Sequence, residues 1–576
     1  MNKTKFIALL LCNLILFAKC EKNTQNSLTV YPSNITFAAE GGTDTLNIET
    51  DANSWKIFSS SAGWLNISSN YGKTKKATVI LSVTTQTSIP RYDTLKVSAG
   101  DAEPVYVYVS QLASDISYTI SANNSNINFS SENDSSLITI STDAPKWTIT
   151  SDANWISFSQ DTGLKGSTNV YVRTDWNNQT SVRSAIINIS ADKAASFQIN
   201  VTQEAAIYPS YNINPIAPDP TGMNSTAKEI ATKIKVGWNL GNSLEAIGGE
   251  TSWGNPKTSQ EIINMVKESG FNAIRIPCSF NQYMADSKTA ELNSDWLARV
   301  KEVIQYCINN DMYVILNIHW DGGWLENNCT LNQKKETNAK QKAFWEQIAT
   351  YLRDFDEHLL FASANEPNVN DATQMSVLAS YHQTFINAIR STGGKNKYRV
   401  LVIQGPSTDI EKTNNLMNTL PNDPTPDKLM VEIHYYTPWN FCGLTEDASW
   451  GKMFYYWGKD YHSTTDPERN ATWGEEETVD NMFKLMKTKF VDKGIPVVLG
   501  EFSATRRSSL TGDALSLHLA SRAYFSKYVT KQAKANGLIP FYWDNGATVN
   551  GCAIFNRNNL TVFEPETLQA IMQGAE

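Results

Sequence analysis

The sequence predicts a multidomain protein in which two N-terminal all-β sandwiches of immunoglobulin-like type precede a (β/α)8 TIM barrel. Its 576 residues are too many for one ordinary domain. The N-terminal third alternates short β-type runs with polar turns, whereas the C-terminal part alternates apolar strand-like runs with helical patterns. A proline-rich segment separates the two patterns, so we expect a domain boundary there.

The composition is that of a folded, acidic protein. Apolar residues make up 41% of the chain and charged residues 19%, which are ordinary values for globular domains. The net charge of -9 argues against nucleic acid or anionic membrane surfaces as partners. The 16 tryptophans and 23 tyrosines are numerous, and their rings suit both core packing and stacking on the flat faces of sugars.

Residues 1–22 resemble a bacterial lipoprotein signal segment. An apolar run from residue 6 to residue 18 is too short for a stable transmembrane helix. Cys20 follows at the position of the lipid-modified cysteine of such proteins, although Lys19 stands where a small residue is usual. The resemblance implies an exported protein attached through a lipidated Cys20, as an outer-membrane lipoprotein at the cell surface. A periplasmic or freely secreted protein is the alternative.

The other cysteines and the histidines give no metal-binding pattern. Beyond the signal segment the cysteines are widely spaced and form no CxxC pair, so neither a zinc site nor a disulfide framework is implied. The six histidines form no HExxH motif. We therefore expect neither a metal nor another cofactor.

The segment from about residue 28 to residue 205 repeats itself. Four residues recur 91 or 92 positions later in the chain. The pairs are Trp55 with Trp147, Trp64 with Trp155, Arg91 with Arg183 and Gln111 with Gln203. Two β-sandwiches, spanning residues 23–113 and 114–206, are the simplest account of this repeat.

These repeats resemble BACON domains, small β-sandwiches that often precede carbohydrate-active domains. Two roles are open: sugar binding through exposed tryptophans, or a spacer that holds a catalytic domain away from the membrane. Because the paired tryptophans recur at the same places in both repeats, they suit a sandwich core at least as well as a binding surface, and we favour the spacer. Residues 207–226 then carry several prolines and are expected to form a stiff, extended linker.

Residues 227–576 alternate β-type and helical patterns, which implies parallel βα units. The runs expected to be strands are 234–240, 273–277, 312–319, 359–366, 399–404, 429–434, 496–501 and 539–543. Helical patterns between them include 259–269, 295–309, 374–391 and 479–493. Eight strands favour a (β/α)8 barrel with inserted loops. A doubly wound open sheet is the alternative, but no glycine-rich dinucleotide loop follows the first strand.

Polar and aromatic side chains gather at the predicted C-terminal ends of these strands, where such barrels carry their chemistry. They are Asn239, Arg275, His319, Asn365, Glu366, His434, Tyr436, Glu501 and Trp543. Glu366 and Glu501 each end an apolar run, and Pro367 favours an extended conformation at Glu366. One such carboxylate is typical of a solvated strand end. Two indicate a carboxylate pair for splitting a glycosidic bond.

Short motifs along this domain add a more specific resemblance. They are Gly237-Trp-Asn-Leu-Gly-Asn-Ser243, Glu250-Thr-Ser-Trp-Gly-Asn-Pro256, Ile274-Arg-Ile-Pro277, Asn317-Ile-His319, Asn365-Glu-Pro367, His434-Tyr-Tyr436, Gly500-Glu-Phe502 and Tyr542-Trp-Asp-Asn545. In this order they resemble glycoside hydrolase family 5, the cellulase family of the clan with glutamates on strands four and seven. The first two motifs most resemble its endoglucanase and xyloglucanase branch.

The resemblance implies a role for each strand-end residue. Glu366 would be the acid/base and Glu501 the nucleophile of a retaining hydrolysis, with the charge of Glu501 helping to keep Glu366 protonated. Arg275 and Tyr436 would orient the nucleophile. The residues expected to bind substrate are Asn239, His319, Trp320, Asn365, His434 and Trp543.

Two features depart from the usual family pattern or extend it. His319-Trp320 stands where relatives often have two histidines, so one polar sugar contact becomes a stacking contact. Residues 437–479 form an aromatic-rich insertion after the sixth strand. We expect about half of its rings to pack on one another, and the rest to line an extended cleft.

The sequence therefore predicts a monomeric, retaining endo-β-1,4-glucanase whose partner is a plant β-glucan. Cellulose, mixed-linkage glucan and xyloglucan remain open as substrates, with endo-xyloglucanase as the main alternative activity. A non-catalytic surface glycan-binding lipoprotein is the alternative from another class. Such a protein is expected to lack one of the two glutamates, and both are present.

Overall fold

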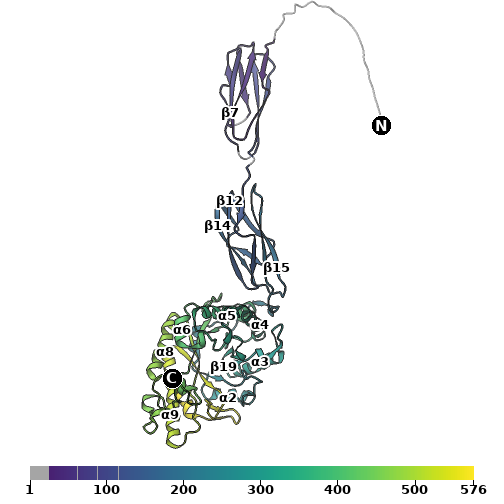
Figure 1. Cartoon of the computed structure of the whole chain (residues 1–576). Helices are drawn as coiled ribbons and strands as arrows, with labels where there is room; N and C mark the ends of the chain where they lie inside the picture. The colour runs from purple at the N-terminus through teal and green to yellow at the C-terminus, as the bar shows by residue number, and fades with distance from the viewer. Residues whose placement is uncertain (1–24, 61–62, 87–88, 115) are drawn as a thin grey trace, which may run out of the picture. The chain divides into compact units, whose positions relative to one another are not determined.

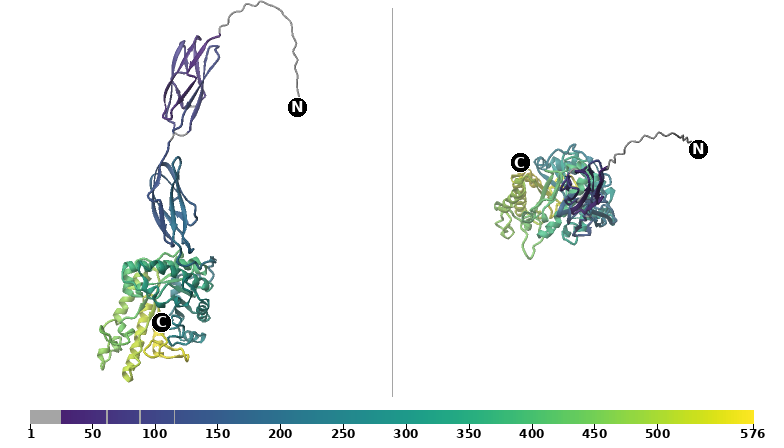
Figure 2. Two further views of the ribbon diagram at one scale, coloured as in Figure 1. Left: turned by 45° about the vertical axis from the view of Figure 1, so that its right-hand side comes forward. Right: turned by 90° about the horizontal axis from the view of Figure 1, so that it is seen from above.

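The computed structural model describes residues 25–60, 63–86, 89–114 and 116–576. The predicted signal segment, including Cys20, lies outside the described residues. The chain divides into two compact units, one built of β-strands and one containing a barrel with its helices, and each is described by itself (Figures 1 and 2). Among the described residues, no helix has both the length and the apolar character needed to cross a membrane.

The first repeat is a sandwich of two sheets, as the alternating pattern predicts. One sheet has the order β1-β3-β7-β5 and the other β2-β9-β8-β4-β6. The strands are β1 (Leu28–Tyr31), β2 (Asn34–Phe37), β3 (Gly42–Thr50), β4 (Trp55–Ser59), β5 (Leu65–Ile67), β6 (Tyr71–Gly72), β7 (Lys76–Val83), β8 (Arg91–Ala99) and β9 (Val105–Gln111). Alternate residues such as Leu46, Val79, Leu95 and Val107 are buried between the sheets, because successive side chains of a strand point to opposite faces.

The second repeat is a sandwich with longer strands. Its strands are β10 (Ile120–Ala122), β11 (Asn126–Phe129), β12 (Asp134–Ser151), β13 (Ile156–Phe158), β14 (Thr162–Thr174), β15 (Arg183–Ala191) and β16 (Phe197–Gln203). They hydrogen-bond in the order β11-β16-β15-β12-β14-β13, and β10 also pairs with β12. In the first repeat β3 and β4 belong to different sheets. Strand β12 covers the equivalent positions of both, so in the second repeat a single strand replaces them.

Two of the four repeated tryptophans, Trp55 and Trp147, are core residues, whereas Trp64 and Trp155 are only half-buried. Trp55 is 3% exposed and Trp147 is fully buried. Each indole lies against a glycine, where a Cβ would come within 2.3 Å of Trp55 at Gly72 and within 2.4 Å of Trp147 at Gly163. A glycine is thus needed opposite each ring for the sandwich to close, and these two tryptophans do not form a binding surface.

The repeated arginines and glutamines pair with each other. Arg91 Nε donates to Gln111 Oε1 at 3.0 Å, and Arg183 Nε donates to Gln203 Oε1 at 2.8 Å. Both glutamines are fully buried, so each guanidinium satisfies a buried amide oxygen. The repeat therefore preserves a structural contact as well as the core.

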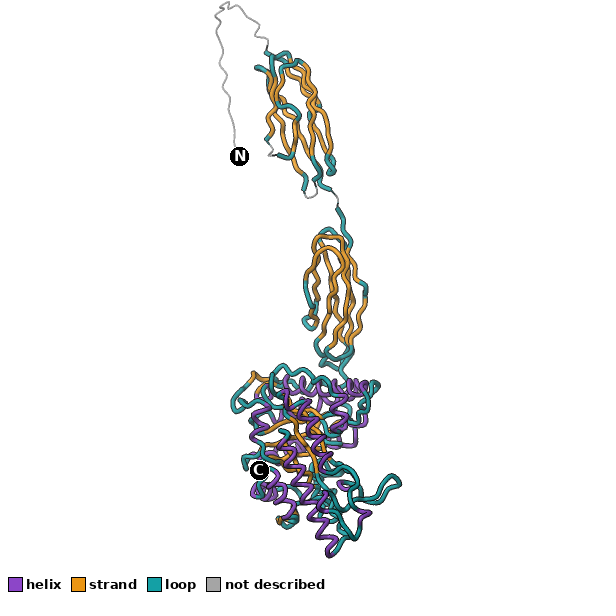
Figure 3. Tube along the Cα trace, turned by 90° about the vertical axis from the view of Figure 1, so that its left-hand side faces the viewer, coloured by secondary structure: helices purple, strands orange, loops and turns teal. Residues whose placement is uncertain are grey.

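The C-terminal unit contains the predicted barrel. Eight parallel strands close in the order β18-β19-β22-β23-β25-β26-β27-β28, and β18 pairs with β28 (Figure 3, strands in orange). They are β18 (Gly237–Leu240), β19 (Ala273–Cys278), β22 (Tyr313–Ile318), β23 (Leu359–Ala362), β25 (Leu401–Gln404), β26 (Leu429–Tyr435), β27 (Val497–Phe502) and β28 (Leu538–Asp544).

Helices surround these strands, as the alternating pattern predicts. The α-helices are α1 (Ala227–Lys233), α2 (Gln260–Glu268), α3 (Ser294–Ile308), α4 (Lys334–Leu352), α5 (Ala372–Ser391), α6 (Ile410–Leu416), α7 (Trp439–Cys442), α8 (Glu476–Lys489), α9 (Gly512–Ala535) and α10 (Pro565–Gly574). Two short hairpins are β20 (Met284–Asp286) with β21 (Glu291–Leu292), and β29 (Phe555–Asn556) with β30 (Thr561–Val562). The 3-10 helices are η1 (Asn281–Tyr283), η2 (Asp321–Gly323), η3 (Glu326–Asn328), η4 (Lys395–Lys397), η5 (Pro406–Thr408), η6 (Lys459–Tyr461), η7 (Pro467–Arg469) and η8 (Val491–Lys493).

The barrel interior changes from apolar to charged along its axis. Ala273 belongs to an apolar cluster that also contains Met430. Two residues further along the same strands come Arg275 and Glu432, both fully buried, and then His434. Because residues two apart share a face of a strand, the C-terminal end of the barrel becomes a charged chamber on an apolar base.

The proline-rich segment does not stand free as the predicted linker. Ser210 Oγ and the Tyr211 amide both donate to Glu346 Oε2 in α4, at 3.0 and 2.8 Å. Strand β17 (Ile216–Pro218) then pairs with β24 (Gly393–Gly394). The buried Glu346 carboxylate accepts hydrogen bonds from this segment and so fastens it to the barrel unit.

The aromatic insertion divides as its composition predicts. Buried rings are Phe441, Phe454, Tyr456 and Trp457, whereas Trp439, Trp450 and Trp473 are exposed. Phe441 and Trp457 pack against Phe525 of α9, and the exposed set remains available to a ligand.

Candidate active site

The two predicted catalytic glutamates lie at the C-terminal end of the barrel but are held in different ways. Glu501 is inside β27, and its side chain is 6% exposed. Glu366 lies four residues beyond β23, in a loop instead of at the strand end that its apolar run predicted. Its side chain is 45% exposed, so it is open to a ligand.

Buried side chains fix the loop that carries Glu366. Glu326 Oε1 accepts the Asn365 amide at 3.3 Å, and the Glu326 carbonyl accepts the Asn368 amide at 2.9 Å. Gln404 Oε1 accepts the Ala364 amide at 2.8 Å. The backbone on both sides of the acid is therefore anchored, although it belongs to no strand.

Glu501 accepts hydrogen bonds at both carboxylate oxygens. Arg275 Nη1 lies 2.8 Å from Oε1, and the Tyr436 hydroxyl donates to Oε2 at 2.9 Å. The guanidinium of Arg275 also donates to Asn365 Oδ1 at 2.8 Å through Nη2. Arg275 and Tyr436 thus hold the carboxylate in one orientation, and Arg275 links it to the residue preceding Glu366.

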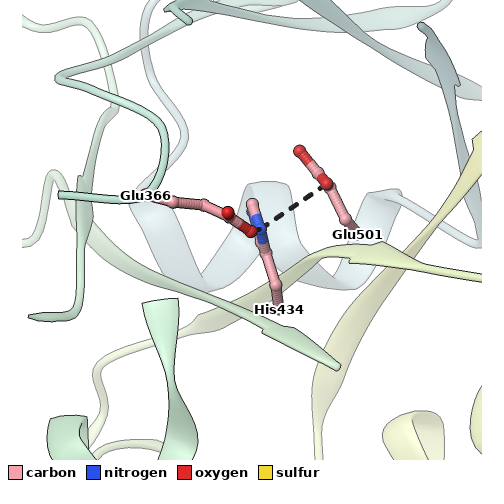
Figure 4. Close-up of side chains that lie close together, drawn as sticks. All are labelled: Glu366, His434 and Glu501. Carbon is pink, nitrogen blue, oxygen red and sulfur yellow. Dashed lines mark hydrogen bonds and ion pairs between the residues drawn. The ribbon is translucent and has the colours of Figure 1, made fainter. Parts of the chain in front are cut away.

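His434 lies between the two glutamates (Figure 4). Its Nδ1 is 2.7 Å from Glu366 Oε1 and 3.6 Å from Glu501 Oε2. A carboxylate oxygen of each glutamate and a ring nitrogen of His434 all lie within 4.8 Å of one another. This spacing is close to that of retaining glycosidases and far short of the separation that inverting enzymes need.

The pKa directions in this cluster correct one expectation. Desolvation lowers the pKa of His434, but the charge of Glu501 and the bonds to Glu366 and Glu432 outweigh it and raise the pKa to about 9. Desolvation raises the pKa of Glu366, yet the hydrogen bond and charge of His434 leave it below the ordinary value. Desolvation raises the pKa of Glu501, against the charges of His434 and Arg275.

The sequence predicted a protonated Glu366 beside an ionised Glu501. That prediction did not take the imidazole of His434 into account. The raised pKa of His434 and the lowered pKa of Glu366 favour the proton of this short contact on His434 in the unliganded protein. The proton that Glu366 needs as the acid is therefore available from His434, its hydrogen-bond partner.

Asn239 does not have the substrate-binding surroundings that the sequence predicted. It is fully buried. Its Nδ2 donates to the carbonyls of Gly500 and Tyr542 at 2.8 and 3.2 Å, and its Oδ1 accepts from Arg275 at 3.0 Å. With both ends of the amide engaged below the site, Asn239 positions Arg275 instead of reaching a sugar.

The other predicted substrate residues lie at the C-terminal ends of barrel strands or directly after them. The rings of His319 and Trp543 stack with centroids 5.8 Å apart and planes 8° from parallel. Asn317 Nδ2 lies 3.2 Å from His319 Nδ1, and desolvation with the charges of Arg275 and His434 holds the pKa of His319 well below its usual value. A neutral imidazole can offer Nε2–H to a sugar hydroxyl. Trp320 is 47% exposed on the loop after β22.

Sequence reasoning missed Glu432 and Gln404. Both are fully buried at the C-terminal end of the barrel, on β26 and β25. Gln404 Nε2 donates to Glu432 Oε2 at 2.7 Å. The available signal was a charged residue inside an apolar strand, two positions before His434 and therefore on the same face.

Glu366, His434 and Glu501 are also the residues, within the described part of the chain, whose ligand atoms converge closely enough for a metal ion. Their charges are already engaged by Arg275, Tyr436 and one another. The expectation of a metal-free, cofactor-free site stays a prediction.

A carboxyl pair with this spacing at the C-terminal end of a (β/α)8 barrel defines a glycoside hydrolase of the retaining class. A family model described as "Cellulase (glycosyl hydrolase family 5)" matches residues 239–549, more than half of the chain. The chain belongs to glycosyl hydrolase family 5 and is a glycoside hydrolase of cellulase type. A model described as "Viral BACON domain" matches residues 27–114 and 119–206.

Relatives of known activity include xyloglucanases and endoglucanases. A xyloglucan-specific endo-β-1,4-glucanase of Bacteroides ovatus is 33% identical over 458 residues, which cover 76% of this chain and 88% of the relative. Endoglucanase A of Paenibacillus barcinonensis is 38% identical over 378 residues, or 61% of this chain and 90% of the relative.

Solved structures that are similar to this chain also include xyloglucanases. The Bacteroides ovatus xyloglucanase in complex with an XXXG heptasaccharide matches with a TM-score of 0.60 and 31% identity, covering 80% of this chain and 100% of that one. A xyloglucan-specific β-1,4-glucanase from a ruminal metagenomic library, in complex with XXLG, matches with a TM-score of 0.57 and 39% identity, covering 61% and 96%.

Proposed function

We propose that the protein is a retaining endo-β-1,4-glucanase that cleaves plant β-glucans, with xyloglucan as its principal substrate. The observation that carries the activity is the pair formed by Glu366 and Glu501, held by His434 on one side and Arg275 on the other. The preference for xyloglucan is supported by the relatives that carry this specificity in their names.

In the first half of the reaction, a Glu501 carboxylate oxygen attacks the anomeric carbon and forms a glycosyl ester. Glu366 gives its proton to the departing glycosidic oxygen, so the leaving sugar departs as a neutral alcohol. A bound glucan displaces water from the Glu366–His434 pair. Desolvation favours the neutral pair, which moves the shared proton from His434 to Glu366.

In the second half, a water molecule attacks the anomeric carbon from the side that the leaving sugar vacated. Glu366, now a carboxylate, takes the water's proton, and the bond to Glu501 breaks. Two inversions leave the anomeric configuration unchanged. The Asn365 amide, oriented by Arg275 at its oxygen, is placed to donate through Nδ2 to the sugar 2-hydroxyl.

The surroundings of Glu366 suit a polymer with bulky units. A cavity of about 400 Å³ borders Glu366 and His434 and is also lined by Thr408, Asp409 and Trp473. Because Glu366 protonates the leaving oxygen, this cavity receives the leaving part of the chain. Its size suits more than a single bare glucosyl unit, so it has room for a branched unit.

The substrate profile tests this function. On xyloglucan, barley mixed-linkage glucan, carboxymethylcellulose and glucomannan, we expect the highest kcat/KM on xyloglucan and little cleavage of glucomannan. Endo-attack predicts that viscosity falls before many reducing ends appear, and retention predicts a β-configured first product by NMR. Absence of cleavage on all four polymers contradicts the activity. Equal rates on xyloglucan and carboxymethylcellulose contradict only the preference.

A second candidate function concerns the outer face of sheet β2-β9-β8-β4-β6 in the first sandwich. Five aromatic side chains on this face are exposed: Phe58, Tyr71, Tyr92, Tyr106 and Tyr108. At the equivalent positions of the second sandwich stand Thr150, Thr162, Ser184, Gln198 and Asn200, all exposed and polar. The fold therefore does not require the aromatic rings.

We propose that this aromatic face stacks on the β-glucan that the barrel cleaves, and that the second sandwich is a spacer. Sugar rings pack their C–H faces on such aromatics. Exchanging Tyr92, Tyr106 and Tyr108 for the residues of the second sandwich (Y92S, Y106Q and Y108N) is expected to weaken retention on immobilised glucan about tenfold or more. The full chain carrying Glu501→Gln keeps the polymer intact during the measurement.

The matched control places three tyrosines on the second sandwich, at Ser184, Gln198 and Asn200. If the face acts through its aromatic rings, this variant binds glucan more tightly than the parent chain. Unchanged binding in the first variant assigns the spacer role to both sandwiches.

A further inference from the structure

Glu432 is a fully buried carboxylate that no step of the hydrolysis uses. It lies on β26, beneath the catalytic glutamates, and its side chain touches three others. Arg275 Nε is 2.9 Å from Oε1, His434 Nε2 is 3.1 Å from the same oxygen, and Gln404 Nε2 donates to Oε2 at 2.7 Å. Each of these contacts continues to a catalytic group.

Arg275 connects Glu432 to the nucleophile. Its Nε faces Glu432, while Nη1 lies 2.8 Å from Glu501. Because the guanidinium is a rigid plane, the charge attraction between Nε and Glu432 constrains the direction in which Nη1 points, although Nε makes no aligned hydrogen bond there. The position of Glu432 therefore sets the orientation of the Glu501 carboxylate.

His434 connects Glu432 to the acid. The ring has its Nε2 toward Glu432 and its Nδ1 toward Glu366. A carboxylate on Nε2 fixes the rotation of the ring and favours its protonated form, as carboxylate partners of histidine do elsewhere. Gln404 adds a second link, because its Oε1 accepts the Ala364 amide on the loop before Glu366.

The Glu432 carboxylate lies directly against the backbone of Gly500, the residue before the nucleophile. A Cβ at position 500 would lie 2.1 Å from Glu432 Oε1. The absence of a side chain at this position leaves the space that the Glu432 carboxylate occupies. The Gly500-Glu501 motif thus accommodates Glu432 as well as carrying the nucleophile.

We propose that Glu432 is a positioning residue that couples the two catalytic glutamates, fixing Glu501 through Arg275 and Glu366 through His434. This inference rests on the proposed hydrolysis. The charged or titratable groups of the cluster that contains Glu432 are Arg275 on β19, His319 after β22, Glu366 after β23, His434 on β26, Tyr436 after it, and Glu501 on β27.

Replacing Glu432 with glutamine keeps the shape and removes one negative charge from this group. The alkaline limb of kcat/KM reflects loss of the proton shared by Glu366 and His434, and the acidic limb reflects protonation of Glu501. Fewer negative charges make both protonated forms less favourable, so both limbs move to lower pH, by about one unit. We also expect kcat to fall about 100-fold with little change in KM, because orientation, not ground-state binding, is lost.

Three comparisons separate positioning from a purely structural role. Glu432→Asp keeps the charge, so its pH limbs stay near those of the wild type while kcat falls. Glu346→Gln removes another buried, ion-paired glutamate, whose partners are Lys342 and residues 210–212 and not the catalytic cluster, and is expected to lower the melting temperature without moving the limbs. Histidine NMR of Glu432→Gln gives the His434 pKa without relying on turnover, and we expect it below the wild-type value.

The outcomes are distinguishable. A wild-type protein that cleaves no glucan contradicts the proposed function. An active wild type whose Glu432→Gln variant keeps both pH limbs and the His434 pKa, with only a lower melting temperature, overturns the positioning role. A Glu432→Gln variant that fails to fold leaves Glu432→Asp as the test, and a wild-type kcat in that variant also overturns it.

Discussion

Replacing Glu501 with glutamine is expected to lower kcat/KM on β-glucan by about 10⁴-fold or more, because a neutral amide cannot form the glycosyl ester. The substitution keeps the shape of the side chain, so Arg275 and Tyr436 retain an oxygen or an amide group to contact. Release of reducing ends from soluble glucan measures the effect. Undiminished release would exclude Glu501 as the nucleophile.

The control for this experiment is a buried glutamate outside the site. Glu564 is 4% exposed and lies 3.1 Å from Arg522, so Glu564→Gln also removes a buried, ion-paired carboxylate. We expect it to reduce stability and to leave kcat near the wild-type value. In addition, a 2-deoxy-2-fluoro cellobioside with a good leaving group should label the wild type with one fluorinated cellobiosyl group, and peptide mapping should place this group on Glu501.

The sandwiches and the barrel could be predicted because residues close together in the sequence determine their strands and helices. Alternation with a period of two predicted the sandwich strands, and the repeat offset placed Trp55 and Trp147 at equivalent positions. The barrel followed from eight apolar runs separated by helical patterns, since parallel strands need such crossovers. The fate of the proline-rich segment was not local, because it depends on Glu346, more than a hundred residues away.

The sequence allowed the catalytic residues to be identified, but it did not show which side chains contact one another in the site. Glu366 and Glu501 could be found because each ends an apolar run with a distinct motif. The role of Glu432 depends on which side chains meet when eight strands close, which no spacing in the sequence contains. Asn239 illustrates the same limit: a polar residue near a strand end can point to solvent or into the barrel, and only the packing decides.

The protonation order failed for a related reason. A pair of carboxylates considered alone predicts that one raises the pKa of the other. In the folded protein, His434 is 2.7 Å from Glu366 and leaves the pKa of that carboxyl below its ordinary value, whereas burial raises the pKa of Glu501 against the charges of His434 and Arg275. Short contacts between residues from different strands outweigh the repulsion that the motif alone suggests.

Replacing Glu366 with alanine is expected to give a defect that depends on the leaving group, because only a poor leaving group needs a proton. On natural glucan kcat/KM should fall about 10³-fold, within the range that general acid catalysis contributes. On 2,4-dinitrophenyl cellobioside the phenolate leaves without protonation, so formation of the glycosyl ester should remain near the wild-type rate. Water then attacks slowly without its base, and the ester on Glu501 accumulates as a burst of phenolate.

Adding azide to the Glu366→Ala variant tests directly whether Glu366 acts as the base in the second step. It is a nucleophile that needs no base, and the cavity left by the Glu366 side chain gives it room beside the anomeric carbon. Azide should therefore restore turnover of the dinitrophenyl substrate in Glu366→Ala and yield the β-glycosyl azide, with no effect on the wild type. The matched Glu501→Gln variant keeps its acid and loses its nucleophile, so it should show neither the burst nor this rescue. An equal loss on both substrates, or an α-configured azide, would contradict the assignment of Glu366 as acid/base in a double displacement.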